Sequence, residues 1–411
     1  MNLHKKKIFL SFFLIYFVIT MFQVIFLYFI PLFYLDVLKV DPKELALVQI
    51  FPYLPLFISP LFGYFYDRYF TKEVQSKLLF NICCLILCGS ILIFIFYKES
   101  LYLFGLFTFL SLFSIFLIRT VMSNLYLRIS QEFSSVKQTI ILILRITTIT
   151  AYLTTSILFQ VIIVKISLLT LWHIFFFLCF SVMIIFIVIS VALNSKIQLL
   201  SHTSSIKESS KRHSMNNKNP IMLIIYIAFF LGSSDLLFLY LFSSWILNKF
   251  GESSFRVYSF LLLIFPIGQL LGNILAYKLD LKKSNNGKEY DKRKLMFIGI
   301  ISYMLLMGSL TVSNFVLILI INFGLSFSAS LAIFSYTSFI TDISKNEKFK
   351  TCKFQFLQTY TSLAQIVFVP ISYLVYSFVV IEFLILTSVV LFGISGMFIL
   401  ITYSLEKDLY K

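Results

Sequence analysis

The sequence predicts an all-α membrane protein whose twelve transmembrane helices form two pseudo-symmetric six-helix bundles. Three observations lead to this fold class: the composition, the series of apolar segments and the distribution of Lys and Arg between them. Of the 411 residues, 59% are hydrophobic and 13% are charged, and the mean hydropathy is +0.95. Soluble proteins are about 25% charged, so a chain this apolar could not cover its surface in water. Its high hydrophobicity also excludes a disordered chain.

Twelve apolar segments are long enough to be membrane spans, because about 20 apolar residues cross the hydrocarbon core as a helix. The first has no small-residue cleavage site and is predicted to be an uncleaved anchor. The eleventh is interrupted by Gln358, Gln365 and Pro370. The predicted spans are Ile8–Leu35, Leu45–Tyr66, Leu78–Tyr97, Leu101–Leu127, Thr139–Val164, Ser167–Leu193, Ile221–Leu247, Phe255–Tyr277, Leu295–Val312, Phe315–Thr341, Phe354–Ser377 and Val380–Ser404.

Lys and Arg orient these spans, since cytosolic loops carry the excess of positive charge. Of the 34 Lys and Arg residues, 26 fall on the side that holds both termini and 6 on the other side, counting Arg256 at the start of the eighth span, while Arg119 and Arg145 lie deeper within spans. Both termini are therefore predicted to be cytosolic. The Lys and Arg residues that give the net charge of +16 flank the apolar segments and form no single patch. We therefore expect contact with lipid and not with nucleic acid. Plasma and organellar membranes both remain candidates.

A basic polar segment divides the chain into two halves of similar length. We predict a first bundle over 1–193, a cytosolic linker over 194–220, a second bundle over 221–404 and a cytosolic tail over 405–411. A faint repeat aligns Leu61-Phe62-Gly63 with Leu270-Leu271-Gly272. Two parallel halves with a ligand site between them near mid-membrane suit transport by alternating access.

One local motif lies at the end of the second span: Ser59-Pro60-Leu61-Phe62-Gly63-Tyr64-Phe65-Tyr66-Asp67-Arg68. Gly63 allows close approach of a neighbouring helix. Asp67 is placed to meet the amino terminus of a facing helix, and Arg68 to meet lipid phosphate. The motif resembles the signature between spans two and three of the major facilitator superfamily, a glycine followed four residues later by Asp-Arg. That resemblance implies two rocking six-helix bundles and a cytosolic gate formed by Gly63, Asp67 and Arg68.

The chain also departs from the family pattern. Tyr69-Phe70-Thr71 stands where Gly-Arg-Arg often follows, and the second half has no acidic-basic pair after Gly272. The fifth span contains no glycine, unlike the glycine-rich pattern of proton-driven drug exporters, which disfavours efflux. The arginine usually found early in the fourth span is missing, because Arg119 comes too late in the chain.

Three ionisable residues lie deep in predicted spans, where each costs roughly 3 kcal/mol on insertion scales and is therefore a functional candidate. Arg119 and Arg145 could clamp an anionic solute bidentately; the alternative is that they brace the bundle or reach the inner headgroups. Asp235 could couple transport to protons, because burial raises the pKa of a carboxyl group. The alternative for Asp235 is a structural ion pair.

Polar side chains recur at helical spacing in three spans. Tyr16, Thr20 and Gln23 follow one face of the first span, and the fifth carries Arg145, Thr148, Tyr152 and Ser156. The eleventh carries Gln355, Gln358, Ser362, Gln365 and Ser372. These rows indicate a polar central cavity, with hydrogen bonding between helices as the alternative for any single residue. We expect the substrate cavity to include Tyr16, Gln23, Arg119, Arg145, Tyr152, Gln358 and Gln365.

The sequence therefore predicts a monomeric secondary transporter of a small polar or anionic organic solute, with proton symport as a candidate mechanism. Nucleotide-binding, metalloprotease and hydrolase motifs are missing, and the clustered cysteines have no His or acidic neighbours, so we expect no catalysis, cofactor or metal. Three alternatives stay open: an uncoupled uniporter, a polytopic membrane enzyme, and a receptor or scaffold on the same fold that does not transport.

Overall fold

The computed structural model describes most of the chain, and all the regular structure in the described residues is helical. These residues are 3–30, 33–41, 54–70, 73–97, 99–132, 134–162, 169–196, 254–284, 292–308, 314–345 and 349–360, with short pieces within 44–48, 224–231 and 367–401. Asp235, Gln365, nearly all of the predicted linker and the predicted tail lie outside the described residues.

The structure describes six α-helices in the first half of the chain. They are α1 (Leu3–Val24), α4 (Leu54–Tyr69), α5 (Glu73–Tyr97), α6 (Leu101–Glu132), α7 (Ser134–Ile162) and α8 (Leu169–Lys196). α1 continues directly into a π-helical turn, η1 (Ile25–Phe29), and a second π-helical turn, η2 (Phe33–Val37), follows. Short π-helical stretches are rare in proteins, and those that occur are often found near functional sites. η1 begins two residues after Gln23, so this widened turn lies beside a predicted cavity residue.

The second half contributes three described helices and several shorter helical segments. The helices are α11 (Ser254–Ser284), α12 (Lys292–Gly308) and α13 (Phe315–Ser344). Residues 350–360 are also helical. α13 begins with Asn314 as its N-cap, whose side chain accepts from the backbone N–H groups of Val316 and Leu317. Such a cap satisfies donors that the first turn of a helix leaves without an intrahelical partner.

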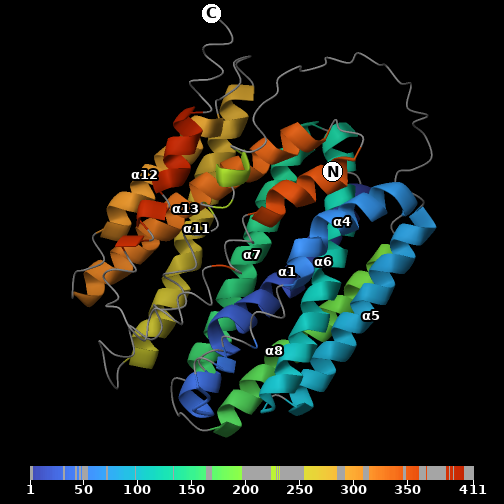
Figure 1. Ribbon diagram of the computed structural model, residues 1–411, viewed down its shortest axis with the longest axis vertical. Coiled ribbons are helices and arrows are strands. Elements are labelled where there is room, and N and C mark those ends of the chain that lie inside the picture. The colour runs from blue at the N-terminus through green and yellow to red at the C-terminus, as the bar shows by residue number, and fades with distance from the viewer. Residues whose placement is uncertain are drawn as a thin grey trace, which may run out of the picture.

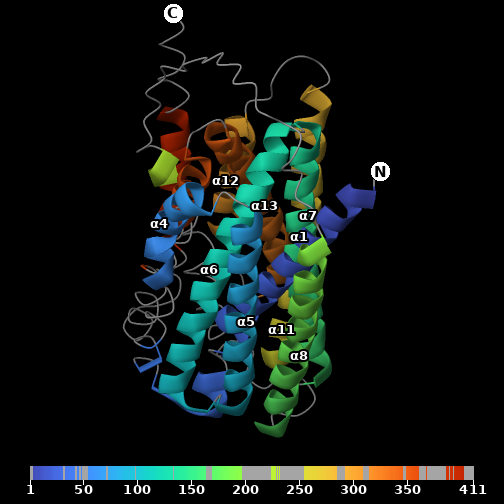
Figure 2. The same cartoon turned by 90° about the vertical axis from the view of Figure 1, so that its right-hand side faces the viewer.

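The helices run alongside one another as an elongated bundle (Figure 1). α11, α12 and α13 lie together on one side, α5, α6 and α8 lie on the other, and α1 and α7 lie between them (Figure 1). The first turns of α1 and the last turn of α4 lie toward the same end of the bundle (Figures 1 and 2). α7 is one of the helices that join the two halves, and it packs against α11 and α13.

Five described helices are long and apolar enough to cross a membrane: Val74–Tyr97, Leu101–Gln131, Gln138–Ile162, Leu169–Leu193 and Val316–Ser344. They coincide with the predicted spans three, four, five, six and ten. Many of their large apolar side chains are exposed, including Leu85 at 72% and Phe96 at 78%. Apolar faces of this extent are typical of contact with lipid. These observations indicate a multi-pass integral membrane protein, and the total of twelve spans stays a prediction.

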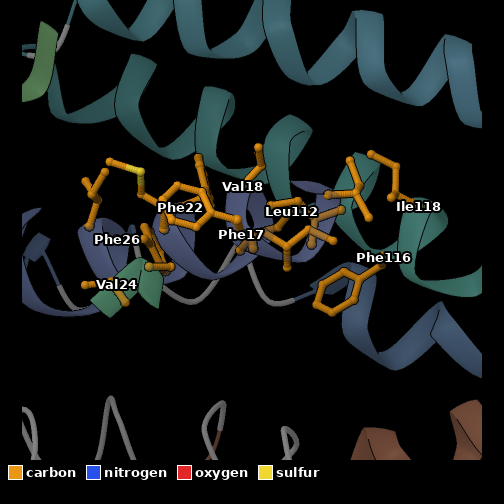
Figure 3. Packing of buried hydrophobic residues seen from close by; sticks show 14 of the residues in the cluster. Phe17, Val18, Phe22, Val24, Phe26, Leu112, Phe116 and Ile118 are labelled. Carbon is orange, nitrogen blue, oxygen red and sulfur yellow. The ribbon is translucent and has the colours of Figure 1, made fainter. Parts of the chain in front are cut away.

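Aromatic side chains fill the interior of the first half. Phe33, Trp172 and Phe176 are all fully buried, and their rings meet edge-on or tilted at centroid distances between 5.3 and 5.8 Å. Phe29 is also fully buried and meets Phe175 edge-on at 5.1 Å. Such arrangements are favoured by the ring quadrupoles. Close by, side chains of α1 and α6 form a further part of this core, shown in Figure 3 with Phe17, Val18, Phe22, Leu112, Phe116 and Ile118 labelled.

Glycines set the close packing of the second half. A Cβ atom added at Gly272 of α11 would lie 2.5 Å from the carbonyl oxygen of Phe327, and one added at Gly299 of α12 would lie 2.7 Å from that of Ser328. Both neighbours belong to α13, whose own small residues permit the approach. Gly272 therefore packs within its own half of the chain, in contrast to its repeat partner Gly63.

Candidate functional site

Gly63 of α4 lies against backbone of the second half of the chain. A Cβ atom at this position would be 2.7 Å from Cα of Cys352 and 2.9 Å from its backbone nitrogen. Real Cβ atoms do not approach so closely, so a larger residue would push α4 away from the helical segment 350–360. The glycine of the motif thus allows a direct backbone contact between the two halves.

Asp67, one helical turn after Gly63, caps that same segment. Its Oδ2 atom accepts the backbone N–H groups of Thr351 at 2.9 Å and Cys352 at 3.1 Å. The backbone N–H of Lys353 bonds to the carbonyl of Phe349, so Thr351 and Cys352 belong to the first helical turn. A helix leaves its first N–H groups without intrahelical partners and carries partial positive charge there. Asp67 therefore acts as an N-cap supplied by a distant helix.

Asn124 of α6 completes this arrangement, which we call the Asp67 contact (Gly63, Asp67, Asn124, Thr351 and Cys352). Its Nδ2 atom donates to Oδ1 of Asp67 at 3.3 Å and to Oγ1 of Thr351 at 2.8 Å. Asn124 is buried; its bond to Thr351 is shielded from solvent and its bond to Asp67 is partly buried. The Asp67 contact thus joins α4, α6 and the segment 350–360 through one carboxylate and one amide.

Two residues of the same motif lie at the rim of the Asp67 contact. The ring of Tyr64 lies 5.2 Å from that of Phe349, measured between centroids. Arg68 is exposed, donates from Nη1 to the Tyr64 hydroxyl at 3.0 Å, and lies over the Tyr69 ring. In this arrangement Arg68 stays on its own helix and faces outward, as a residue that contacts lipid phosphate would.

Arg119 of α6 meets Gln23 of α1 inside the first half. Its Nη2 atom donates to Oε1 of Gln23 at 2.8 Å. Its Nε atom is buried and has no hydrogen-bond partner among the described residues. The hydrogen-bond partner of Arg119 among the described residues is thus a side-chain amide of α1, which fits both a place in a polar cavity and a brace between helices.

Tyr16 belongs to the same group of polar side chains, which we call the arginine cluster (Tyr16, Gln23, Arg119 and Ser123). The hydroxyl of Tyr16 is hydrogen-bonded to the side chain of Ser123, and the charges of both Arg119 and Arg145 act on it. Ser123 also accepts from Nε2 of Gln355 at 3.0 Å, and Gln355 is buried. The polar rows of α1 and of the segment 350–360 therefore meet through one serine of α6.

The polar row of α7 faces the second half. Arg145 donates from Nη2 to Oγ1 of Thr337 on α13 at 2.7 Å. Tyr152 packs against Phe265 of α11 with a centroid distance of 6.2 Å, and Ser156 is fully buried. Thr148 donates to the carbonyl of Leu144 in its own helix, so its hydroxyl needs no partner elsewhere.

The structure thus brings together four of the predicted cavity residues, Tyr16, Gln23, Arg119 and Arg145, and places Tyr152 further along α7. Gln358 is half-buried in the segment 350–360, three residues after Gln355. The predicted cavity residue Gln365 and the predicted coupling residue Asp235 fall outside the described part of the chain. Within the described residues, no three His, Cys, Asp or Glu side chains form a group that could hold a metal ion.

Sequence reasoning missed four residues that this geometry singles out: Ser123, Asn124, Thr337 and Thr351. Asn124 carried a usable signal, because an amide within an apolar span must find a partner in the protein. Ser123 and Thr337 carried little, since hydroxyls in helices are commonly satisfied by their own backbone. Thr351 contributes mainly its backbone N–H, which no side-chain pattern reveals.

A narrow pocket lies between α1, η1, α5, α6 and α8. Its walls are mostly apolar, and Thr108 and Ser111 are its only hydroxyl-bearing lining residues. The Thr108 hydroxyl donates to the carbonyl of Phe104. This pocket therefore offers a polar solute less than the arginine cluster does.

Comparison with known proteins finds proteins of similar structure but no match in sequence. No protein-family model matches the chain. No curated protein matches it in sequence either. Among solved structures, a mutant form of the nucleoside transporter NupG is similar with a TM-score of 0.66 and 13% identity, over 97% of this chain and 100% of that one. The unmutated nucleoside transporter NupG is similar with a TM-score of 0.63 and 13% identity, over 98% and 99%. Over nearly its whole length, the chain has the fold of this transporter.

Proposed function

We propose that the chain is a secondary active transporter of the major facilitator type, which moves a small polar or anionic organic solute by alternating access. The observation that carries this proposal is the Asp67 contact, because it joins the two halves at one end of the bundle through a few breakable bonds. The fold shared with a nucleoside transporter and the resemblance of the Gly63–Arg68 motif to the superfamily signature both support it.

The Asp67 contact is suited to a gate that closes and reopens. Its bonds to Thr351 and Cys352 use backbone dipoles that remain in place when α4 withdraws. An interaction between a carboxylate and a helix amino terminus contributes about 0.3–2 kcal/mol, depending on burial. A contribution of this size biases a two-state equilibrium without fixing it. The excess of Lys and Arg on the same side predicts that this gate is cytosolic.

Coupling to protons through Asp235, as symport, is part of the proposal and rests on the sequence alone. An uncoupled uniporter is its direct rival. The two differ in whether a pH gradient drives accumulation of the solute in proteoliposomes. An enzyme is disfavoured because the fold is that of a transporter and the sequence lacks catalytic motifs.

The test uses two cysteines in place of Tyr64 and Phe349, with Cys352 replaced by alanine. A short bifunctional methanethiosulfonate would join the two halves at the Asp67 contact. We expect solute exchange in proteoliposomes to stop when the reagent is added and to recover on reduction. Each single-cysteine variant, treated in the same way, controls for modification alone. Exchange that continues in the joined protein would contradict alternating access at this gate.

A further inference from the structure

The guanidinium group of Arg119 has no acidic partner among the described residues. Its side-chain hydrogen-bond partner is the neutral amide of Gln23, and its buried Nε atom has no hydrogen-bond partner among the described residues. The ion pairs recorded in the described residues, His173 with Glu99 and Lys345 with Asp342, do not involve it. A charge within a membrane protein normally pairs with an opposite charge or faces a polar cavity. Among the described residues, Arg119 therefore has no counter-charge of the kind that its position calls for.

A second positive charge acts on the same place. Arg119 and Arg145 both interact electrostatically with the Tyr16 hydroxyl, so their fields add there. Tyr16 and Ser123 contribute hydroxyl groups, and Gln23 and Gln355 contribute amides. This combination of two cations with neutral hydrogen-bonding groups is complementary to a negative charge.

The donor geometry indicates which kind of negative charge fits. Arg carries five N–H donors in a planar fork that matches the oxygens of a carboxylate or a phosphate. Gln23 accepts from one nitrogen of Arg119, which leaves donors, Nε–H among them, for a ligand. The guanidinium points to Gln23 of α1, within the bundle.

We infer that the arginine cluster is an oxyanion site and that the transported solute carries a carboxylate or phosphate that binds to Arg119. This inference rests on the proposed transport function and narrows its substrate class. It also separates this chain from its structural neighbour, since the nucleosides named for that transporter carry neither group.

The test compares ligands that differ only in the anionic group, using the purified full-length protein. Glucuronate is paired with glucose, and uridine 5′-monophosphate with uridine; lactate, succinate and inorganic phosphate extend the series, and phosphatidylglycerol tests a lipid source. Thermal stabilisation reports binding because a ligand that binds the folded state raises the unfolding temperature. We expect at least one soluble oxyanion to stabilise the protein more than its neutral counterpart. Stabilisation by neutral members alone, or by the lipid alone, would overturn the inference.

Three variants assign the effect to Arg119. Arg119→Gln is expected to weaken oxyanion binding by about tenfold or more, and Arg119→Lys by less, because Lys keeps the charge without the fork. Lys294→Gln removes one exposed positive charge and is expected to bind like the unaltered protein. Without ligand, Arg119→Gln is expected to unfold at the same temperature or higher, since it removes an uncompensated charge. A lower unfolding temperature with unchanged oxyanion affinity would show a structural role and overturn the inference.

Flux measurements separate this inference from the function on which it rests. Transport of neutral members alone in proteoliposomes would overturn the oxyanion site and leave the transporter proposal standing. Oxyanion binding that depends on Arg119, without flux of any bound member, would support the site and contradict transport.

Discussion

The carboxylate of Asp67 accepts the backbone N–H of Thr351 at 2.9 Å, although 284 positions separate the two residues in the chain. The acceptor belongs to a motif at the end of α4, and the donor to the first turn of a helical segment in the other half. One side chain thereby holds the ends of two distant helices together. The predictions below address what this contact does and what lies beneath it.

The first prediction concerns the charge of Asp67. Asp67→Asn keeps the shape of the side chain but removes the charge that interacts with the helix amino terminus. We expect the closed arrangement to lose about 1–2 kcal/mol, which corresponds to a 5- to 30-fold rise in the ratio of open to closed protein. The fraction of the longer distance between spin labels at Tyr69 and Phe349 measures this ratio. Glu99→Gln, a matched change at an exposed acidic residue, is the control, and equal fractions in both variants would contradict the prediction.

The second prediction concerns the close approach at Gly63. Gly63→Leu would place side-chain atoms where Cα of Cys352 now lies. We expect closure to fail, so that conformational exchange and turnover slow far more than solute binding weakens. Gly89→Leu is the control, because a Cβ atom at Gly89 has no neighbour within 4 Å. Normal turnover in Gly63→Leu would count against the gate.

The third prediction concerns the pH dependence of Cys352. Burial, and then the nearby charge of Asp67, raises the pKa of the Cys352 thiol above its ordinary value. The thiolate is the reactive form, so modification should be slow near neutral pH and should accelerate as the pH rises through the raised pKa. Asp67→Asn removes one cause of the increase, and its rate–pH curve should shift to lower pH. A curve that superimposes on that of the unaltered protein would show that the carboxylate does not act on this thiol.

The fourth prediction concerns Asp235, which lies outside the described residues. A carboxyl group at mid-membrane can load and release a proton as access alternates. Asp235→Asn is therefore expected to abolish accumulation driven by a pH gradient while solute exchange continues. Flux in proteoliposomes with and without the gradient measures this, and equally pH-dependent uptake in the variant would exclude the coupling role.

The sequence predicted the helices well wherever an apolar segment ends at polar residues. The predicted span Leu101–Leu127 lies within α6, which continues to Glu132. Hydropathy detects the part of a helix that faces lipid, but a helix can continue into the polar region beyond it. The first span shows the converse limit, because the predicted single segment Ile8–Leu35 changes at Ile25 into a π-helical turn, and apolar composition carries no signal for this change.

Individual residues of the site were predictable, but most of their partners were not. The motif singled out Gly63 and Asp67, and buried charge singled out Arg119. Their partners, Cys352, Thr351 and Gln23, depend on how distant segments pack, and two of these contacts involve backbone atoms. The repeat was misleading at one point: Gly272 aligns with Gly63 but packs against Phe327 of α13, within its own half. Similar local sequence does not fix which neighbour a small residue meets.

The distance between the two halves at the Asp67 contact tests the central claim most directly. Spin labels at Tyr69 and Phe349, both exposed, would report it in a background without the native cysteines. Double electron–electron resonance should show two distances in the protein with Gly63 and Asp67 intact, one matching this structure and one longer. The longer distance should dominate in Gly63→Leu. A single short distance in both proteins would mean that the halves do not separate here, and would contradict alternating access.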